Sequence, residues 1–271
     1  MKRIFITYGD HNYEDSLQRI KAEAEATGIF DEIIIYTPDN LPEPFKGYTT
    51  KYKRGGGYWL WKPYIIKDTL DNANDGDIIV YVDAGCTVQK SKDWFRYFNR
   101  LRSKRGIFFI ACGKSQKWCK KEVFDLFHTR NNLWKHANQI QATFIIIKKT
   151  ADNDVVDRWF EAAKSHPSLF TDVEEEERGN EDKCFKEHRH DQSVLTACVC
   201  TSDNLLQYSL IPEKMEKIHA GGQAVVASRI SSQGRRSTNP TQALYLDVVE
   251  RYILNPIKGF ITKALFLLSR F

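Results

Sequence analysis

The sequence predicts an α/β domain in which a mostly parallel central sheet is flanked by helices. An apolar, mostly β-branched run at residues 78–82 has the composition of a strand covered on both faces. A strand-helix-strand order over residues 3–36 precedes it and favours parallel strands joined by helical crossovers. A chain of 271 residues, 42% of them hydrophobic, is long enough to build one such core.

Local patterns predict the first elements. Residues 3–8 form an apolar strand that ends at Gly9-Asp10. A helix is expected over residues 13–26, with Gly28 as its stop. Residues 31–36 supply the second strand, which closes at a Thr-Pro pair.

A glycine run followed by aromatics occupies residues 54–64, reading Arg-Gly-Gly-Gly-Tyr-Trp-Leu-Trp-Lys-Pro-Tyr. The glycines predict a pliable loop, and Pro63 predicts that a helix begins near it. Arg54 and Lys62 would then flank a helix N-terminus, which attracts phosphate. The block is not a Walker A loop, because no Ser or Thr follows the lysine. The alternative is a plain linker whose aromatics, Trp61 among them, belong to the core.

The strand at residues 78–82 delivers a carboxylate, Asp83, at its end. Ala84 and Gly85 follow and remove bulk, so that a ligand or a metal ion would be able to approach the backbone. In open α/β sheets ligands bind at the carboxyl ends of the strands. The alternative for Asp83 is a turn residue that caps the next element.

The second half continues the α/β pattern. Helices are expected over residues 93–101 and 153–164, and strands over 107–111 and 142–148. Residues 117–136 contain mixed helical patches.

A polar block, His188-Arg189-His190-Asp191-Gln192, then leads into a packed helix. Asp191 has a second interpretation as the N-cap of that helix. His219, further along, is a weak signal by itself, since a lone histidine is usually a satisfied surface or core residue.

We expect the chain to divide into a domain over residues 1–225, a flexible connection over 226–241 and a helical tail over 242–271. Lys258, Lys263 and Arg270 border or oppose the apolar face of the tail. A basic amphipathic helix of this kind fits a membrane-surface anchor, and it equally fits docking onto the domain or a partner subunit. The apolar face comprises Ile253, Ile257, Phe260, Ile261, Ala264, Leu265 and Leu268.

Charge and cysteine content narrow the function classes. The net charge of +5 favours anionic ligands without requiring nucleic acid, so no nucleic-acid partner is expected. The six cysteines form no CxxC pair, which argues against a zinc knuckle or a disulfide framework and favours a reducing compartment. The apolar part of the N-terminus is short for a signal peptide, so we expect a cytoplasmic protein with possible peripheral membrane contact through residues 253–271.

Together, five motifs resemble nucleotide-sugar-dependent glycosyltransferases of the GT-A fold, of the bacterial polysaccharide or O-antigen type. They cover most of residues 1–222 in the order of that family. The motifs are Thr7-Tyr8-Gly9-Asp10, the block at 57–63, Tyr81-Val82-Asp83-Ala84-Gly85, His190-Asp191-Gln192-Ser193 and the late His219. The resemblance implies a GT-A-like, Rossmann-like sheet. It also implies transfer of a sugar from a nucleotide donor, UDP-sugar foremost, to a glycan or lipid-linked glycan in surface polysaccharide synthesis.

The resemblance places Asp83 at the first position of the DxD motif, which holds a divalent cation against the donor diphosphate. Gly85 stands where that family has the second aspartate, so Asp83 and His219 are the implied ligands of a Mn²⁺ or Mg²⁺ ion. In the alternative scheme Lys62 and Arg54 neutralise the diphosphate, and Asp83 contacts sugar hydroxyls.

For the chemistry, Asp191 is the candidate general base of an inverting reaction, positioned by His190 and Gln192. In a retaining reaction it would sit beside the oxocarbenium-like centre or hold the donor sugar. By resemblance, Tyr8 and Asp10 lie near the nucleobase and ribose. A non-catalytic nucleotide- or sugar-binding module and a nucleotidyltransferase remain as alternatives.

Overall fold

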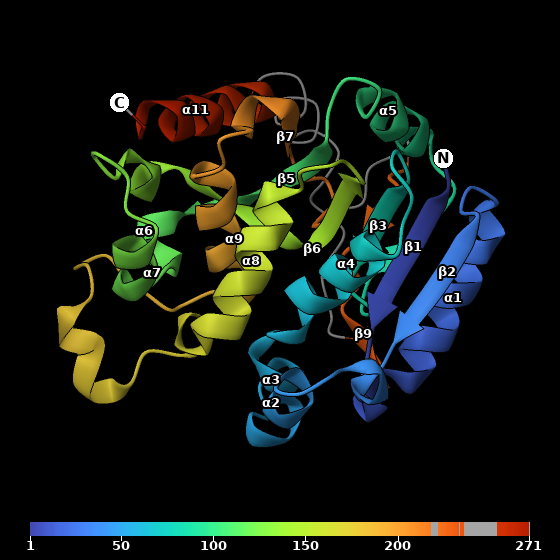
Figure 1. Ribbon diagram of the computed structural model, residues 1–271, viewed down its shortest axis with the longest axis horizontal. Coiled ribbons are helices and arrows are strands. Elements are labelled where there is room, and N and C mark those ends of the chain that lie inside the picture. Colours follow the sequence, from blue (N-terminus) through green and yellow to red (C-terminus); the bar gives the residue numbers. More distant parts are fainter. Residues whose placement is uncertain (218–221, 233, 236–253, 271) are drawn as a thin grey trace.

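A computed structural model describes residues 1–217, 222–232, 234–235 and 254–270. Its centre is a six-stranded sheet in the order β2-β1-β3-β6-β5-β7 (Figure 1). Within this sheet only β6 runs antiparallel to its neighbours, so the prediction of a mostly parallel sheet is confirmed. The strands are β1 (Arg3–Tyr8), β2 (Glu32–Tyr36), β3 (Ile78–Val82), β5 (Gly106–Lys114), β6 (Asn138–Lys148) and β7 (Tyr208–Pro212).

Helices cover both faces of the sheet and create a hydrophobic cluster on each. One face packs against α1 (Glu14–Thr27) and α5 (Lys92–Arg100). The other packs against α4 (Trp61–Asp71), α8 (Asp154–Ser165) and α9 (His190–Cys200). Side chains alternate between the two clusters along β1 and β3, as the strand period of two requires.

Shorter elements complete the described chain. Two pairs of two-residue strands lie outside the main sheet, and part of the connection expected over 226–241 belongs to them. Residues 233 and 236–241 of that connection lie outside the described part. The pairs are β4 (Thr87–Val88) with β8 (Val225–Val226), and β9 (Ile230–Ser231) with β10 (Gly234–Arg235). The short helices are α2 (Phe45–Lys51), α3 (Gly55–Tyr58), α6 (Ser115–Trp118) and α7 (Lys121–Leu126).

Two predicted helix starts need correction. Helix α4 begins at Trp61, so Pro63 is its third residue rather than its first. Helix α9 begins at His190 after Arg189 as its N-cap, which makes the N-cap interpretation of Asp191 wrong. Asp191 is instead the second residue of the helix, and its carboxylate contacts another element.

The glycine block forms a left-handed turn rather than a pliable linker. All five residues from Gly55 to Trp59 have positive φ, including 53° at Tyr58 and 57° at Trp59. A Cβ on Gly57 would lie 2.9 Å from the backbone carbon of Tyr48 in α2, so the approach of the two backbones requires glycine there. Tyr58 and Trp59 each carry a backbone strain of roughly 1–2 kcal/mol.

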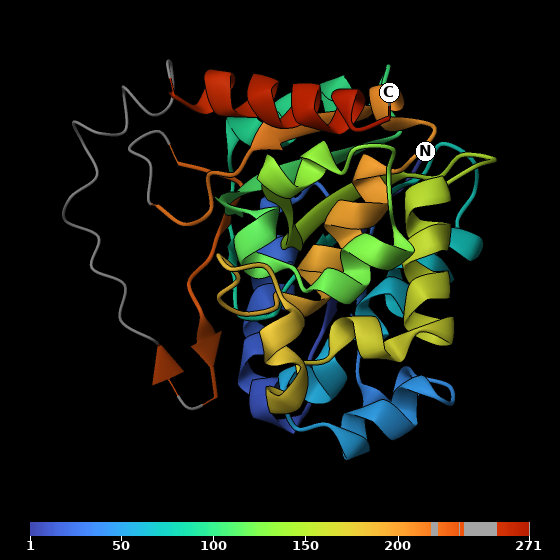
Figure 2. The same ribbon diagram turned by 90° about the vertical axis from the view of Figure 1, so that its left-hand side faces the viewer.

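The C-terminal helix α11 (Asn255–Leu268) packs beside the edge strand β7 (Figures 1 and 2). Its buried residues include the small Gly259 and Thr262, which allow close approach, and Phe266. Within the predicted apolar face, Ile257, Phe260, Ile261 and Leu268 are exposed, while Ile253 lies outside the described residues. None of the described helices is long and apolar enough to cross a membrane.

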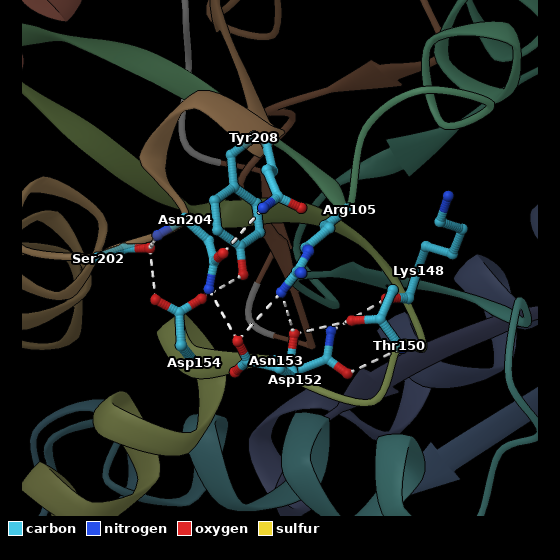
Figure 3. Close-up of polar contacts among 10 residues, drawn as sticks. Arg105, Lys148, Thr150, Asp152, Asn153, Asp154, Ser202, Asn204 and Tyr208 are labelled. Atoms are coloured by element: carbon cyan, nitrogen blue, oxygen red, sulfur yellow. Dashed lines mark hydrogen bonds and ion pairs between the residues drawn. The ribbon is translucent and has the colours of Figure 1, made fainter.

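A polar network joins the start of α8 to the loop between α9 and β7 (Figure 3). Asp154 accepts hydrogen bonds from the Ser202 hydroxyl at 2.5 Å and the Tyr208 hydroxyl at 2.8 Å. Asp152 accepts from Asn204 at 2.8 Å and forms an ion pair with Arg105 at 3.2 Å. Because neighbouring side chains already contact these carboxylates, we assign the network a structural role.

Candidate active site

A cleft of about 1040 Å³ opens at the carboxyl ends of β1 and β3, where ligands bind in open α/β sheets. Six of the residues predicted for the site line it: Tyr8, Asp10, Arg54, Trp61, Asp83 and Gly85. Lys62, His190, Asp191 and Gln192 are not among the lining residues. His219 lies outside the described residues.

An aromatic pair forms one wall of the cleft. The rings of Tyr8 and Trp61 stack at a centroid distance of 3.8 Å. Tyr8 is only 5% exposed, and its hydroxyl has no hydrogen-bond partner within the described part of the chain. Burial and the nearby Asp10 carboxylate raise the pKa of Tyr8, so the hydroxyl keeps its proton. A ligand group in the cleft would satisfy this buried hydroxyl.

Lys62 connects the two predicted carboxylates behind the cleft wall. Its ammonium lies 2.6 Å from Asp191 Oδ2 and 3.1 Å from Asp83 Oδ1, and it donates to the Ala142 carbonyl at 3.2 Å. Asp83 Oδ1 also accepts a hydrogen bond of 2.5 Å from the Tyr81 hydroxyl. Lys62 is 2% exposed, so it does not stand at an open helix N-terminus as the sequence suggested.

The positive charge of Lys62 and the negative charges of Asp83 and Asp191 stabilise one another. Burial by itself would lower the pKa of Lys62, but Asp191 and Asp83 outweigh it and raise that pKa, so the ammonium stays charged. Burial raises the pKa of Asp191, and Lys62 offsets only part of this. The result is a buried cation that holds an aspartate of α9 and the aspartate after β3 in fixed positions.

His190 packs against the left-handed turn and does not line the cleft. Its ring lies 5.2 Å from those of Tyr58 and Trp59, and its Nδ1 lies 2.9 Å from the Phe170 carbonyl. Burial lowers the pKa of His190 to about 4, so the ring is neutral at neutral pH. Its Nε2 lies 3.7 Å from Asp172.

Asp172 also holds Arg54. The Arg54 guanidinium donates to Asp172 at 2.9 Å, and the Tyr58 hydroxyl donates to the same carboxylate at 2.7 Å. Arg54 nevertheless lines the cleft, and further N–H groups of its guanidinium can serve a ligand.

Gln192 anchors α9 to the sheet. Its amide donates to Gln139 of β6 at 2.6 Å, and Gln139 in turn donates to Ser193 at 2.9 Å. This places Gln192 among the residues that position α9, and it does not line the cleft.

Sequence reasoning missed several residues of the cleft. Arg229 and Glu216, paired at 2.5 Å, come from the segment before β9, and Lys53 precedes the glycine turn. Arg19 of α1 does not line the cleft itself, but it donates to the carbonyls of Ala84 and Cys86 at 2.9 Å each and so fixes the loop after Asp83. No local pattern marks these residues, because only the tertiary fold brings them to the cleft.

The described residues do not fit the implied divalent cation. No group of three or more His, Cys, Asp or Glu residues in the described chain is placed to hold a metal ion. Asp83 Oδ1 already contacts an ammonium and a hydroxyl. A side chain at position 85 would have its Cβ 3.3 Å from the Ile230 carbonyl oxygen, so the missing second carboxylate has little room.

No protein-family model and no curated protein matches the chain. Among solved structures it is similar to the galactosyltransferase LgtC in complex with donor and acceptor sugar analogues, at 13% identity and a TM-score of 0.38, over 77% of this chain and 73% of that one. It is also similar to the glycosyltransferase GlyE of Streptococcus pneumoniae TIGR4, at 13% identity and a TM-score of 0.39, over 78% and 45% of the two chains. Mouse xyloside xylosyltransferase 1 gives 8% identity and a TM-score of 0.39, over 78% and 85%. Because these similarities are low, the function of this chain has to follow from the geometry of its own cleft.

Proposed function

We propose that the chain is a glycosyltransferase that moves a sugar from a nucleotide-sugar donor, a UDP-sugar, to a glycan or lipid-linked acceptor. The observation that carries the proposal is the cleft at the ends of β1 and β3. Asp83 lines it, and the buried Lys62 holds that aspartate beside Asp191. Perturbed, mutually coupled ionisable groups at a cleft are typical of active sites.

The cleft suits the parts of such a donor. The Tyr8 and Trp61 wall, with Asp10 beside it, offers an aromatic surface, an unsatisfied hydroxyl and a carboxylate to a base and its ribose. Lys53, Arg54 and Arg229 also line the cleft and provide cations for a diphosphate. Cations at this place would stabilise the negative charge that develops on the leaving nucleoside diphosphate.

We assign Asp83 the contact with the substrate and Asp191 a positioning role. The sequence had suggested Asp191 as the general base, but Asp191 does not line the cleft and its carboxylate faces Lys62. Asp83 lines the cleft, and Tyr81 and Lys62 fix its orientation through Oδ1. His190 and Gln192 keep the first turn of α9 in place behind it.

Donor hydrolysis tests the proposal. Purified protein should release nucleoside diphosphate slowly from at least one nucleotide sugar in a panel, measured by chromatography. Asp83→Asn should lower the rate by about 100-fold or more while circular dichroism shows an unchanged fold. The matched control is Asp203→Asn, which changes an exposed aspartate outside the cleft and should keep the wild-type rate.

Other outcomes identify the competing functions. Nucleotide binding without turnover of any donor would support a binding module. Release of pyrophosphate in place of nucleoside diphosphate would support a nucleotidyltransferase.

We further propose that the protein acts at the inner face of a bacterial membrane in surface polysaccharide synthesis. The support is the exposed apolar side of α11, where Phe260 is 75% exposed and Ile257, Ile261 and Leu268 are each about half exposed. Helices that bind in the membrane interface bury such a side among the lipid headgroups.

A further inference from the structure

Lys62 places its ammonium between the two carboxylates of Asp83 and Asp191. Asp83 reaches it from the end of β3 and Asp191 from the first turn of α9, at 3.1 and 2.6 Å. The third acceptor is the Ala142 carbonyl of β6 at 3.2 Å. An ammonium has three donors, and three oxygens surround this one.

The remaining surroundings keep the ammonium in this place. The rings of Tyr81 and Trp61 lie 5.2 and 5.7 Å from Lys62 Nζ, within the range of cation–π attraction. Lys62 is 2% exposed, so its charge faces the two aspartates and not the open cleft. A divalent cation at Asp83 would meet this fixed positive charge at close range, and the two would repel.

The cleft has its own cations for an anionic ligand. Lys53, Arg54 and Arg229 line it from two different segments of the chain. Arg54 and Arg229 each contact a carboxylate, which orients the guanidinium and leaves further N–H groups for phosphate oxygens.

We propose that Lys62 replaces the divalent cation of the site, and that Lys53, Arg54 and Arg229 bind the donor diphosphate without a metal ion. The inference rests on the proposed function for the identity of the ligand. The role of Lys62 between the two aspartates can be tested without any donor.

Titration with Mn²⁺ alone tests whether Lys62 prevents a divalent cation from binding to Asp83 and Asp191. Free Mn²⁺ is followed by electron paramagnetic resonance as the full chain is added, and no stoichiometric binding is expected. In Lys62→Met the two aspartates lose their ammonium, and one Mn²⁺ per chain should bind. The matched control is Lys67→Met on the same helix, because Lys67 also bridges two aspartates, Asp71 and Asp157, away from the cleft. The Lys67→Met variant should bind no Mn²⁺. That result would show that Mn²⁺ binding by Lys62→Met is specific to the pair Asp83 and Asp191 and is not shared by every pair of neighbouring carboxylates.

A Mn²⁺ site in the wild-type chain that disappears in Asp83→Asn would overturn the proposal. So would a folded Lys62→Met variant that binds no Mn²⁺. If Lys62→Met does not fold, the comparison of UDP affinity in EDTA and in MnCl₂ still decides whether the site uses a metal ion.

Calorimetry with UDP then tests whether the diphosphate binds without a metal ion. The affinity for UDP should be the same in EDTA and in MnCl₂, and Arg229→Gln should weaken it in both. An affinity that is lost in EDTA would contradict the inference. Absence of UDP binding under both conditions would count against the proposed function, while the Mn²⁺ titration would still report on Lys62.

Discussion

At the scale of single residues, the buried charges of the site make it sensitive to substitution. Removing one partner of a buried ion pair leaves an uncompensated charge, at a typical cost of about 3–5 kcal/mol. Lys62 forms such a buried pair with Asp191 and a second pair with Asp83, whose side chain is 32% exposed. The arrangement therefore contributes to the order of the site as well as to its charge.

His190 gives the protein a dependence of stability on pH. Its pKa is about 4 in the folded chain because burial disfavours the charged ring, whereas an unfolded histidine titrates near 6.5. Above pH 6.5 the ring is neutral in both states. As the pH falls from 6.5 to 4 only the unfolded state takes up the proton, so stability is lost over this window, by on the order of 3 kcal/mol.

The variant His190→Asn should lose less stability than the wild type between pH 7 and pH 4.5, measured by urea unfolding. Asparagine tolerates the positive φ of 41° at this position. His188, whose pKa burial and the neighbouring His190 lower, and Asp191 are present in both proteins, so most of their contribution is common to the two. Parallel losses in the two proteins would contradict the assignment to His190.

At the scale of elements, the left-handed turn Gly55–Trp59 depends on its glycines. Gly57→Ala would combine a φ of 100° with contact against the backbone of α2, and should cost about 3 kcal/mol or more. Gly28→Ala is the matched control, because Gly28 also has positive φ, 68°, but open space around it. It should cost about 1 kcal/mol.

Thermal unfolding and UDP calorimetry measure the two effects. Gly57→Ala should lower both the melting temperature and the affinity for UDP, since the turn carries residues that line the cleft. Gly28→Ala, at the end of α1, should lower the melting temperature slightly and leave UDP binding unchanged. Equal effects of the two substitutions would show that the backbone of α2 can move to accommodate a Cβ at position 57 at little cost.

The elements differ in how far the sequence predicts them. Strand β1 was predicted with its observed bounds, because its apolar run is bounded by polar residues and a glycine. The turn at Gly55 was not predicted as left-handed, since three glycines permit many conformations and the packing against α2 selects one. Strands β8 and β9 have two residues each, too few for any period to show.

In the site, too, the sequence predicts some residues, while others depend on the tertiary packing. Asp83 was predicted as a cleft residue from the strand that precedes it, and it lines the cleft. The contact of Lys62 with Asp191 joins residues 129 positions apart, and no pattern near either residue indicates it. Which aspartate meets the cleft and which lies behind it depends on the packing of α9 against β6, which a single sequence does not reveal.

At the scale of the whole molecule, α11 and the cleft lie at different ends. In Figures 1 and 2 α11 is at the top, while α3 and β9, which contribute to the lining of the cleft, are at the bottom. A membrane bound at the apolar side of α11 would leave the cleft at a distance from the bilayer. An acceptor on a lipid would then need a glycan long enough to extend to the cleft.

Sedimentation with anionic liposomes tests the membrane contact. Phe260→Ser should reduce the bound fraction, because it removes the most exposed large apolar side chain of the described part of α11. Phe95→Ser on α5 is the matched control, since Phe95 is 78% exposed but lies outside α11, and it should sediment like the wild type. Equal binding of all three proteins would contradict a role for α11 at membranes.

Helix α9 is held at both ends by parts of the chain that are far apart in sequence. Its first turn carries Asp191 on Lys62, while the Cys200 carbonyl at its end accepts from Arg270 at 3.1 Å. An α-helix resists compression along its axis, and eleven residues span about 16 Å. Helix α9 thus connects the C-terminal segment, through Arg270, with the ion pair of Asp191 and Lys62 at its other end.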